Sequence, residues 1–116
     1  MNKRYETVFI LTPVLSEEQM KETVKKYAST IEELGGKVVF DQNWGLKKLA
    51  YPIQKKTTGF YQIFEFEGPA DLTAKLELIY RRDEKVLRYL VVTLDKHGIA
   101  YNENKRTVGK EQVTVN

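Results

Sequence analysis

The segment that decides the fold of this chain is Gly45-Leu46-Lys47-Lys48-Leu49-Ala50-Tyr51-Pro52-Ile53. It sets two adjacent lysines between apolar residues and closes on a tyrosine–proline step. Because proline lacks a backbone donor and restrains the residue before it to extended backbone, the segment is predicted to be a strand end that enters a loop. Paired cations beside a rigid aromatic suit a polyanionic partner. A half-buried strand whose lysines simply face water is the alternative.

Outward from this segment, hydrophobic alternation predicts strands. Their expected ranges are Arg4–Leu11, Lys37–Tyr51 with a bulge near Gly45, Phe60–Glu67 and Val86–Leu94. The polar run Gln54–Gly59 is predicted to be a loop between the second and third strands.

Helical spacing predicts two helices between these strands. The first begins after Ser16 with a capping-box pattern, stops at Gly35-Gly36, and buries the stripe Met20, Val24, Tyr27, Ile31 and Leu34. The second follows Gly68-Pro69, ends at Arg81-Arg82, and buries the stripe Leu72, Leu76 and Ile79.

The element order is therefore β-α-β-β-α-β. Right-handed crossovers turn that order into a four-stranded antiparallel sheet with both helices on one face, the ferredoxin-like α+β sandwich. With 116 residues, one domain is expected, over residues 1–96. The polar run 97–116 is predicted to be a flexible C-terminal tail.

Composition restricts the function. The chain has 19 Lys+Arg against 16 Asp+Glu, a net charge of +3, which permits nucleic-acid binding without requiring it. It has no cysteine, so disulfides, thiolate metal sites and thiol catalysis are excluded. The start Met1-Asn2-Lys3-Arg4 lacks the apolar segment of a signal peptide, and no apolar run reaches membrane-spanning length. A cytoplasmic protein without a membrane partner is expected.

Residues for catalysis are missing from the pattern. His97 is the single histidine, and the adjacent carboxylates Glu17-Glu18 diverge on a helix. The loop after the first strand, Thr12–Ser16, has neither the arginine nor the glycine of an acylphosphatase-like phosphate loop. We therefore expect no enzymatic activity, no catalytic residue, no metal, no cofactor and no small-molecule substrate.

Two helices cover only one side of such a sheet, so the other side is available for a partner. Alternation predicts that this open face carries the apolar residues Val8, Ile10, Tyr61, Ile63, Leu90 and Val92. The last strand is apolar on both sides, so its inward side stays undecided. A contiguous apolar patch indicates an interaction site. The third strand departs from the base-stacking signature of RNA-recognition motifs at most positions, which favours a protein partner.

Taken together, the motifs resemble the family of bacterial small-subunit ribosomal protein S6. The resemblance spans Arg4 to Thr93 and is carried by Arg4-Tyr5-Glu6, the Gly45–Ile53 segment, Gly59-Phe60-Tyr61 and Val86-Leu87-Arg88. It implies a structural constituent of the small ribosomal subunit. It also implies binding to the central domain of small-subunit ribosomal RNA, cooperatively with ribosomal protein S18, in subunit assembly and translation.

Carried over residue by residue, the resemblance implies RNA-proximal roles for Arg4, Tyr5, Lys47, Lys48 and Arg88. Lys47 and Lys48 stand where the family often has arginine, which keeps the charge but loses bidentate phosphate geometry. Lys55 and Lys56 are further candidates, although solvated charge explains them equally well. The open face would take the partner protein.

Two other functions remain compatible with the residues. One is a regulatory domain that uses its apolar face to form a homodimer without RNA. The other is an independent RNA-recognition module, which would bind single-stranded RNA alone and lose it on Phe9→Ala or Tyr61→Ala.

Overall fold

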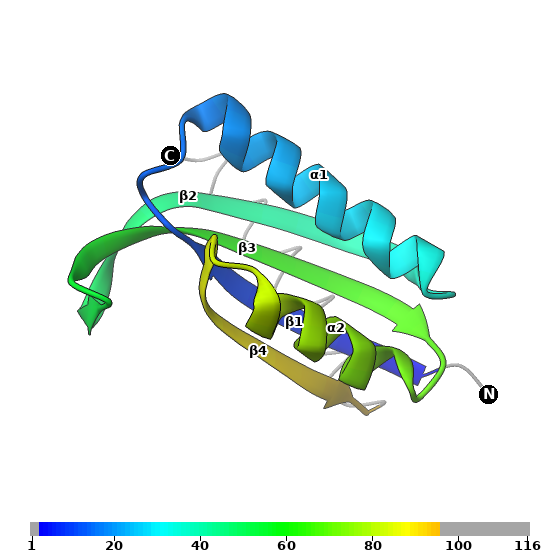
Figure 1. The fold of residues 1–116 in the computed structure, drawn as a ribbon. Coiled ribbons are helices and arrows are strands. Elements are labelled where there is room, and N and C mark those ends of the chain that lie inside the picture. The colour runs from blue at the N-terminus through cyan, green and yellow to red at the C-terminus, as the bar shows by residue number, and fades with distance from the viewer. Residues whose placement is uncertain (1–2, 96–116) are drawn as a thin grey trace, which may run out of the picture.

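The computed structural model describes residues 3–95 (Figure 1). The elements follow the predicted order: β1 (Lys3–Leu11), α1 (Glu17–Glu33), β2 (Lys37–Ile53), β3 (Lys56–Gly68), α2 (Leu72–Arg82) and β4 (Val86–Leu94). His97 and the tail predicted at 97–116 lie outside the described residues.

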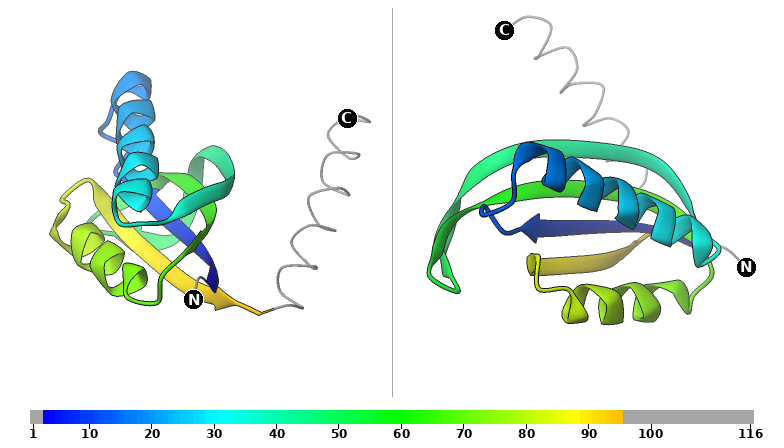
Figure 2. Two further views of the ribbon diagram at one scale, coloured as in Figure 1. Left: turned by 90° about the vertical axis from the view of Figure 1, so that its right-hand side faces the viewer. Right: turned by 45° about the horizontal axis from the view of Figure 1, so that its top comes forward.

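The four strands form one antiparallel sheet in the order β2-β3-β1-β4. Both helices cover the same face, so the molecule has two layers (Figures 1 and 2). The predicted ferredoxin-like α+β sandwich is confirmed. β2 and β4 are the two edges, while β1 and β3 lie in the middle and supply every buried residue that the sheet adds to the core cluster except Val86 of β4.

The core lies between the sheet and the helices, because alternate residues of β1 point that way. Tyr5, Phe9 and Leu11 are at most 3% exposed. The Phe9 ring lies 5.1 Å from Tyr27 and 5.2 Å from Tyr80, measured between ring centroids. Burial of one such side chain stabilises the fold by about 1.5–3 kcal/mol. The packing of these three core rings therefore joins β1 to both helices.

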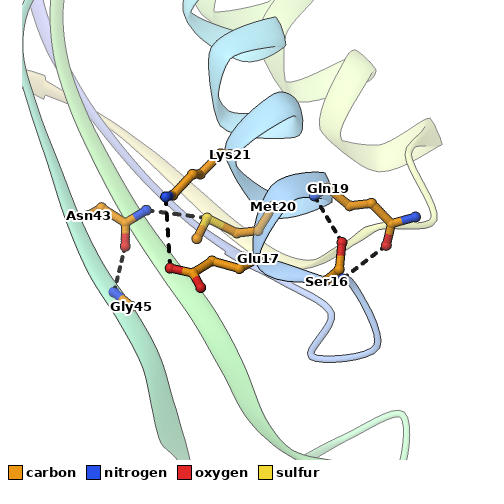
Figure 3. A network of polar contacts seen from close by, with 7 residues as sticks. All are labelled: Ser16, Glu17, Gln19, Met20, Lys21, Asn43 and Gly45. Atoms are coloured by element: carbon orange, nitrogen blue, oxygen red, sulfur yellow. Dashed lines mark hydrogen bonds and ion pairs between the residues drawn. The ribbon is translucent and has the colours of Figure 1, made fainter.

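The first helix begins as predicted. The Ser16 hydroxyl accepts from the Gln19 backbone N–H at 3.1 Å, and the Gln19 side chain accepts from the Ser16 N–H at 2.9 Å (Figure 3). This capping box satisfies two amides that the helix itself leaves without partners. Met20, Tyr27 and Ile31 are buried, whereas Val24 and Leu34 are only partly buried at the edge of the core.

The second helix buries Leu72 and Leu76 as predicted, but its third buried residue is Tyr80. Ile79 is only partly buried. The reason is a hydrogen bond of 3.0 Å between the hydroxyls of Tyr80 and Thr7, which satisfies both groups inside the core. Helical periodicity cannot predict a buried hydroxyl partner that lies on a strand, such as Thr7 of β1.

The hairpin between β2 and β3 is longer than predicted. The expected loop Gln54–Gly59 is wrong, because β2 continues to Ile53 and β3 begins at Lys56. Only Gln54 and Lys55 remain in the turn, with φ of 50° and 67°, the left-handed pair of the tightest hairpin turns. Pro52 is tolerated because β2 is an edge strand whose pairing shifts between Lys48 and Ile53.

Candidate nucleic-acid and protein interface

The open face is the side of the sheet that α1 and α2 leave uncovered. The strand register places Val8 beside Ile63 and Leu90, and Ile10 beside Tyr61, so the predicted residues share this face. The structure shows which side of β4 faces the core: Tyr89 and Val91 pack on the core, while Leu90 and Val92 are 58% and 39% exposed.

The six predicted partner-face residues are not equally accessible. Ile10 and Ile63 are each 7% exposed and form part of the floor of the face. Val8 and Tyr61 are partly buried. All six residues thus lie on the predicted open face, but Leu90 and Val92 expose the most apolar surface there. The role of this face in binding a partner stays a prediction.

At one end of this face, the hairpin formed by β2 and β3 extends beyond β1 and curves (Figures 1 and 2). Gly59 of β3 lies where this hairpin packs against the end of β1. A Cβ placed there would lie 2.4 Å from Cγ2 of Ile10 and 3.7 Å from Cδ2 of Leu49, which is itself 6% exposed. The hairpin therefore packs closely on the end of β1.

This curvature brings Tyr51 of β2 to Arg88 of β4. Arg88 Nη1 donates to the Tyr51 hydroxyl at 2.9 Å, and the guanidinium carbon lies 5.4 Å from the Tyr51 ring centroid. The hydrogen bond and the positive charge of Arg88 lower the pKa of Tyr51. The same bond raises the pKa of Arg88, with a smaller contribution from Tyr61. Both side chains are exposed. The hydrogen bond orients the Arg88 guanidinium, which has further N–H donors for a ligand.

The cationic hairpin consists of Lys47, Lys48, Lys55 and Lys56. All four are exposed or partly exposed, and no aspartate or glutamate occurs between Asp41 and Glu65. With Arg88, the structure gathers five of the seven predicted RNA-proximal residues on the hairpin and the adjacent end of the sheet. Such a local excess of positive charge attracts phosphates even when the net charge is small.

The other two predicted residues lie at the opposite end of β1. Arg4 Nη1 is 2.5 Å from Oε2 of Glu65, whose side chain is 0% exposed, and Arg4 Nη2 is 3.7 Å from Oε1 of Glu67. Arg4 is therefore engaged within the fold.

Tyr5 is 3% exposed and its ring lies 5.5 Å from that of Phe66, so it lies in the core, and its RNA-proximal role stays a prediction. Its alternation with Phe9 on the helix-facing side of β1 was the signal for a core residue.

Sequence reasoning missed Trp44 as a surface feature. Trp44 is 43% exposed and stacks on Tyr61, with ring centroids 6.2 Å apart and planes 19° apart. Asn43 holds this bulge: its Oδ1 accepts from the Gly45 N–H at 2.7 Å, and its Nδ2 lies 3.3 Å from Met20 Sδ (Figure 3). The signal available in the sequence was a tryptophan next to the glycine of a predicted bulge.

Residues 3–95 contain no group of three or more histidine, cysteine or acidic side chains that could hold a metal ion. None of the helices in this range is long and apolar enough to span a membrane. The fold defines the chain as a small α+β domain of ferredoxin-like architecture that presents an exposed apolar pair on β4 and a cationic hairpin.

The comparisons with known proteins identify the family. The sequence model described as "Ribosomal protein S6" matches residues 4–93. The chain is 55% identical over 108 residues to "Small ribosomal subunit protein bS6" of Christiangramia forsetii, covering 93% of this chain and 96% of that one. It is 53% identical over 105 residues to the protein of the same name from Bacteroides fragilis, covering 90% and 92%. This chain belongs to the ribosomal protein S6 family.

Solved structures agree with the fold. The crystal structure of 30S ribosomal protein S6 from Thermotoga maritima superposes with a TM-score of 0.80 at 27% identity, covering 92% of this chain and 99% of that one. An uncharacterised protein from the same organism superposes with a TM-score of 0.53 at 13% identity, covering 82% and 100%, which shows a shared fold alone.

Proposed function

We propose that this protein is a structural, non-catalytic component of the small ribosomal subunit in the cytoplasm. In this role it binds small-subunit ribosomal RNA in the central domain, together with ribosomal protein S18. The observation that carries the proposal is the adjacency of two different surfaces. Leu90 and Val92 expose an apolar patch on the open face, and Arg88 on the same strand joins that patch to the cationic hairpin.

The two surfaces suit two different partners. An exposed apolar patch on a sheet favours a protein, since apolar burial drives protein association. Lysines at a strand end favour phosphates, which position a protein on RNA without reading its sequence. Because the cationic hairpin and Arg88 together supply only five cations, RNA affinity alone should be modest and strongly dependent on salt. Simultaneous binding of both partners then makes assembly cooperative, and the coupling is reciprocal.

The test is sedimentation of the full chain with a central-domain ribosomal RNA fragment, with and without S18, across a salt series. Tight binding only in the ternary mixture is the expected result. Equal RNA affinity in the absence of S18 would contradict cooperativity and favour an independent RNA-recognition module. A homodimer that binds neither partner would favour the regulatory domain.

A pair of matched variants separates the apolar patch from general surface effects. Leu90 and Leu78 are both exposed leucines, at 58% and 42%, but Leu78 lies on α2 in the other layer. Leu90→Asp should abolish ternary assembly and Leu78→Asp should leave it unchanged. Equal loss from both variants would show that the patch has no special role.

A further inference from the structure

Four residues at the hairpin end of the open face form what we call the aromatic cluster: Trp44, Tyr51, Tyr61 and Arg88. The strand register aligns Arg88, Ile10, Tyr61 and Gly45 in one row across the sheet. Trp44 precedes Gly45 and stacks on Tyr61. Tyr51 arrives from the curved hairpin and bonds to Arg88 at the other end of the row.

The exposed rings of this cluster are held in place although they face solvent. Trp44 is fixed by its stack on Tyr61 and by the Asn43–Gly45 hydrogen bond beside it. Gly45 has a φ of +72°, a conformation that a residue with a Cβ adopts with strain. Tyr51 is 58% exposed and is oriented by Arg88. Rings ordered before binding lose little conformational entropy when a ligand stacks on them.

The charge around the cluster points to the class of ligand. Arg88 and Lys47 are its near cations: Lys47 lies opposite Gly59, the glycine that packs on Ile10. The hairpin carries no carboxylate between Asp41 and Glu65. Aromatic faces interleaved with cations are the means by which proteins hold unpaired nucleotides, whereas duplex RNA hides its base faces.

We propose that the aromatic cluster binds an unpaired segment of RNA. Its bases stack on the exposed rings of Trp44 and Tyr51, and its phosphates contact Arg88 and Lys47. Tyr51 has a second role as a positioning residue, because its hydroxyl holds the Arg88 guanidinium. This inference rests on the proposed RNA-binding function and adds the kind of RNA that the hairpin end of the open face takes.

The protein itself supplies the probe. Trp44 is the single tryptophan of the chain, so its fluorescence lifetime reports on this site alone. Titration of the full chain at low salt with single-stranded oligoadenylate should shorten that lifetime in a saturable manner, since a stacked base quenches indole emission. A duplex RNA of equal charge should leave the lifetime unchanged.

Variants test the assignment of each residue. Tyr51→Ala should weaken oligoadenylate binding about fivefold or more, the size expected for one stacked base. Arg88→Ala should also weaken it, because a phosphate contact is lost. Tyr51→Phe keeps the ring but loses the hydroxyl, so it should weaken binding in the wild type and have no further effect in the Arg88→Ala background. The matched control is Arg82→Ala on α2, which removes the same charge from the helix layer and should change affinity by less than about twofold.

The inference would be overturned by no lifetime change at low salt, by equal quenching by duplex RNA, or by equal effects of Arg88→Ala and Arg82→Ala. A lifetime change produced by S18 without RNA would assign the cluster to the protein interface and would overturn it too. Failure of the ternary complex with wild-type protein would instead remove the proposed function, while oligoadenylate quenching would still establish the nucleotide site.

Discussion

Arg88 Nη1 donates a hydrogen bond of 2.9 Å to the hydroxyl of Tyr51, and this bond joins β4 to β2, the two opposite edges of the sheet. Edge strands of a four-stranded sheet do not normally touch. Here the contact forms because the hairpin of β2 and β3 extends beyond the end of β1 and curves (Figures 1 and 2). The bond therefore links the strand that exposes Leu90 and Val92 to the hairpin of β2 and β3.

Reversal of the paired charges on the hairpin tests its role in RNA binding. Lys47→Glu combined with Lys48→Glu should weaken ternary assembly strongly and lower its salt dependence, because both residues are exposed cations. The free energy of unfolding should change by less than about 0.5 kcal/mol. Sedimentation and urea unfolding measure the two effects.

The matched control for this pair is Lys25→Glu combined with Lys26→Glu, two exposed adjacent lysines on α1. It makes the same change in net charge and should leave assembly intact. An equal loss in both double variants would show that only overall charge matters.

Replacement of Gly59 tests the curvature of the hairpin. Gly59→Ala should destabilise the fold by about 1–3 kcal/mol, because the added Cβ would lie 2.4 Å from Ile10 Cγ2 and 3.2 Å from the Leu11 carbonyl oxygen. Gly45→Asn is the comparison: no atom lies within 4 Å of its Cβ position, and asparagine tolerates left-handed backbone. If urea unfolding shows the Gly45 variant to be the less stable of the two, close packing at Gly59 is not what shapes the hairpin.

The buried tyrosines predict how stability depends on pH. Burial, followed by the Asp83 hydrogen bond, raises the pKa of Tyr27 above its ordinary value of 10.0. The folded state therefore holds this proton more tightly than the unfolded chain, so the stabilisation is complete below pH 10 and is lost as the pH rises above it. Tyr27→Phe should be less stable at pH 7 by about 1.5–3 kcal/mol, since the hydroxyl donates to the Asp83 carboxylate at 2.6 Å.

Above pH 10 the stability difference between wild type and Tyr27→Phe should shrink by about 1.4 kcal/mol per pH unit. Denaturant unfolding from pH 7 to 11 measures it. Tyr51→Phe serves as the control, because the pKa of Tyr51 is lowered and its contribution has the opposite sign. A constant difference for Tyr27→Phe across this range would contradict the assigned direction.

Removal of Arg4 should affect the fold before it affects RNA. Arg4→Ala takes the guanidinium away from the fully buried Glu65 carboxylate, and we expect a loss of about 2–4 kcal/mol in the free energy of unfolding. Lys3→Ala, an exposed neighbour, should have almost no effect. Should Arg4→Ala leave thermal stability unchanged and still weaken RNA binding, Arg4 would be an RNA contact after all.

Local patterns in the chain predicted much of the fold. The alternation of β1, the Ser16 capping box and the apolar run of β4 involve neighbours along the chain, and each element formed where it was expected. The hairpin turn was missed because the polar run Gln54–Gly59 looks like a loop, and residue polarity does not show that Lys56 pairs with Ile53 across a two-residue turn. Tyr80 replaced Ile79 in the core for a similar reason, a hydroxyl partner on β1.

Some features of the candidate site follow from residue order alone, and others depend on tertiary packing. The sequence by itself determined the lysine pair, the Tyr-Pro step, the family resemblance and the apolar character of the last strand, because these are properties of residue order. Only the tertiary structure decided that Leu90 and Val92 face outward and that Tyr51 meets Arg88 across the sheet. These outcomes depend on strand register and hairpin curvature, which arise from packing between residues far apart in the chain.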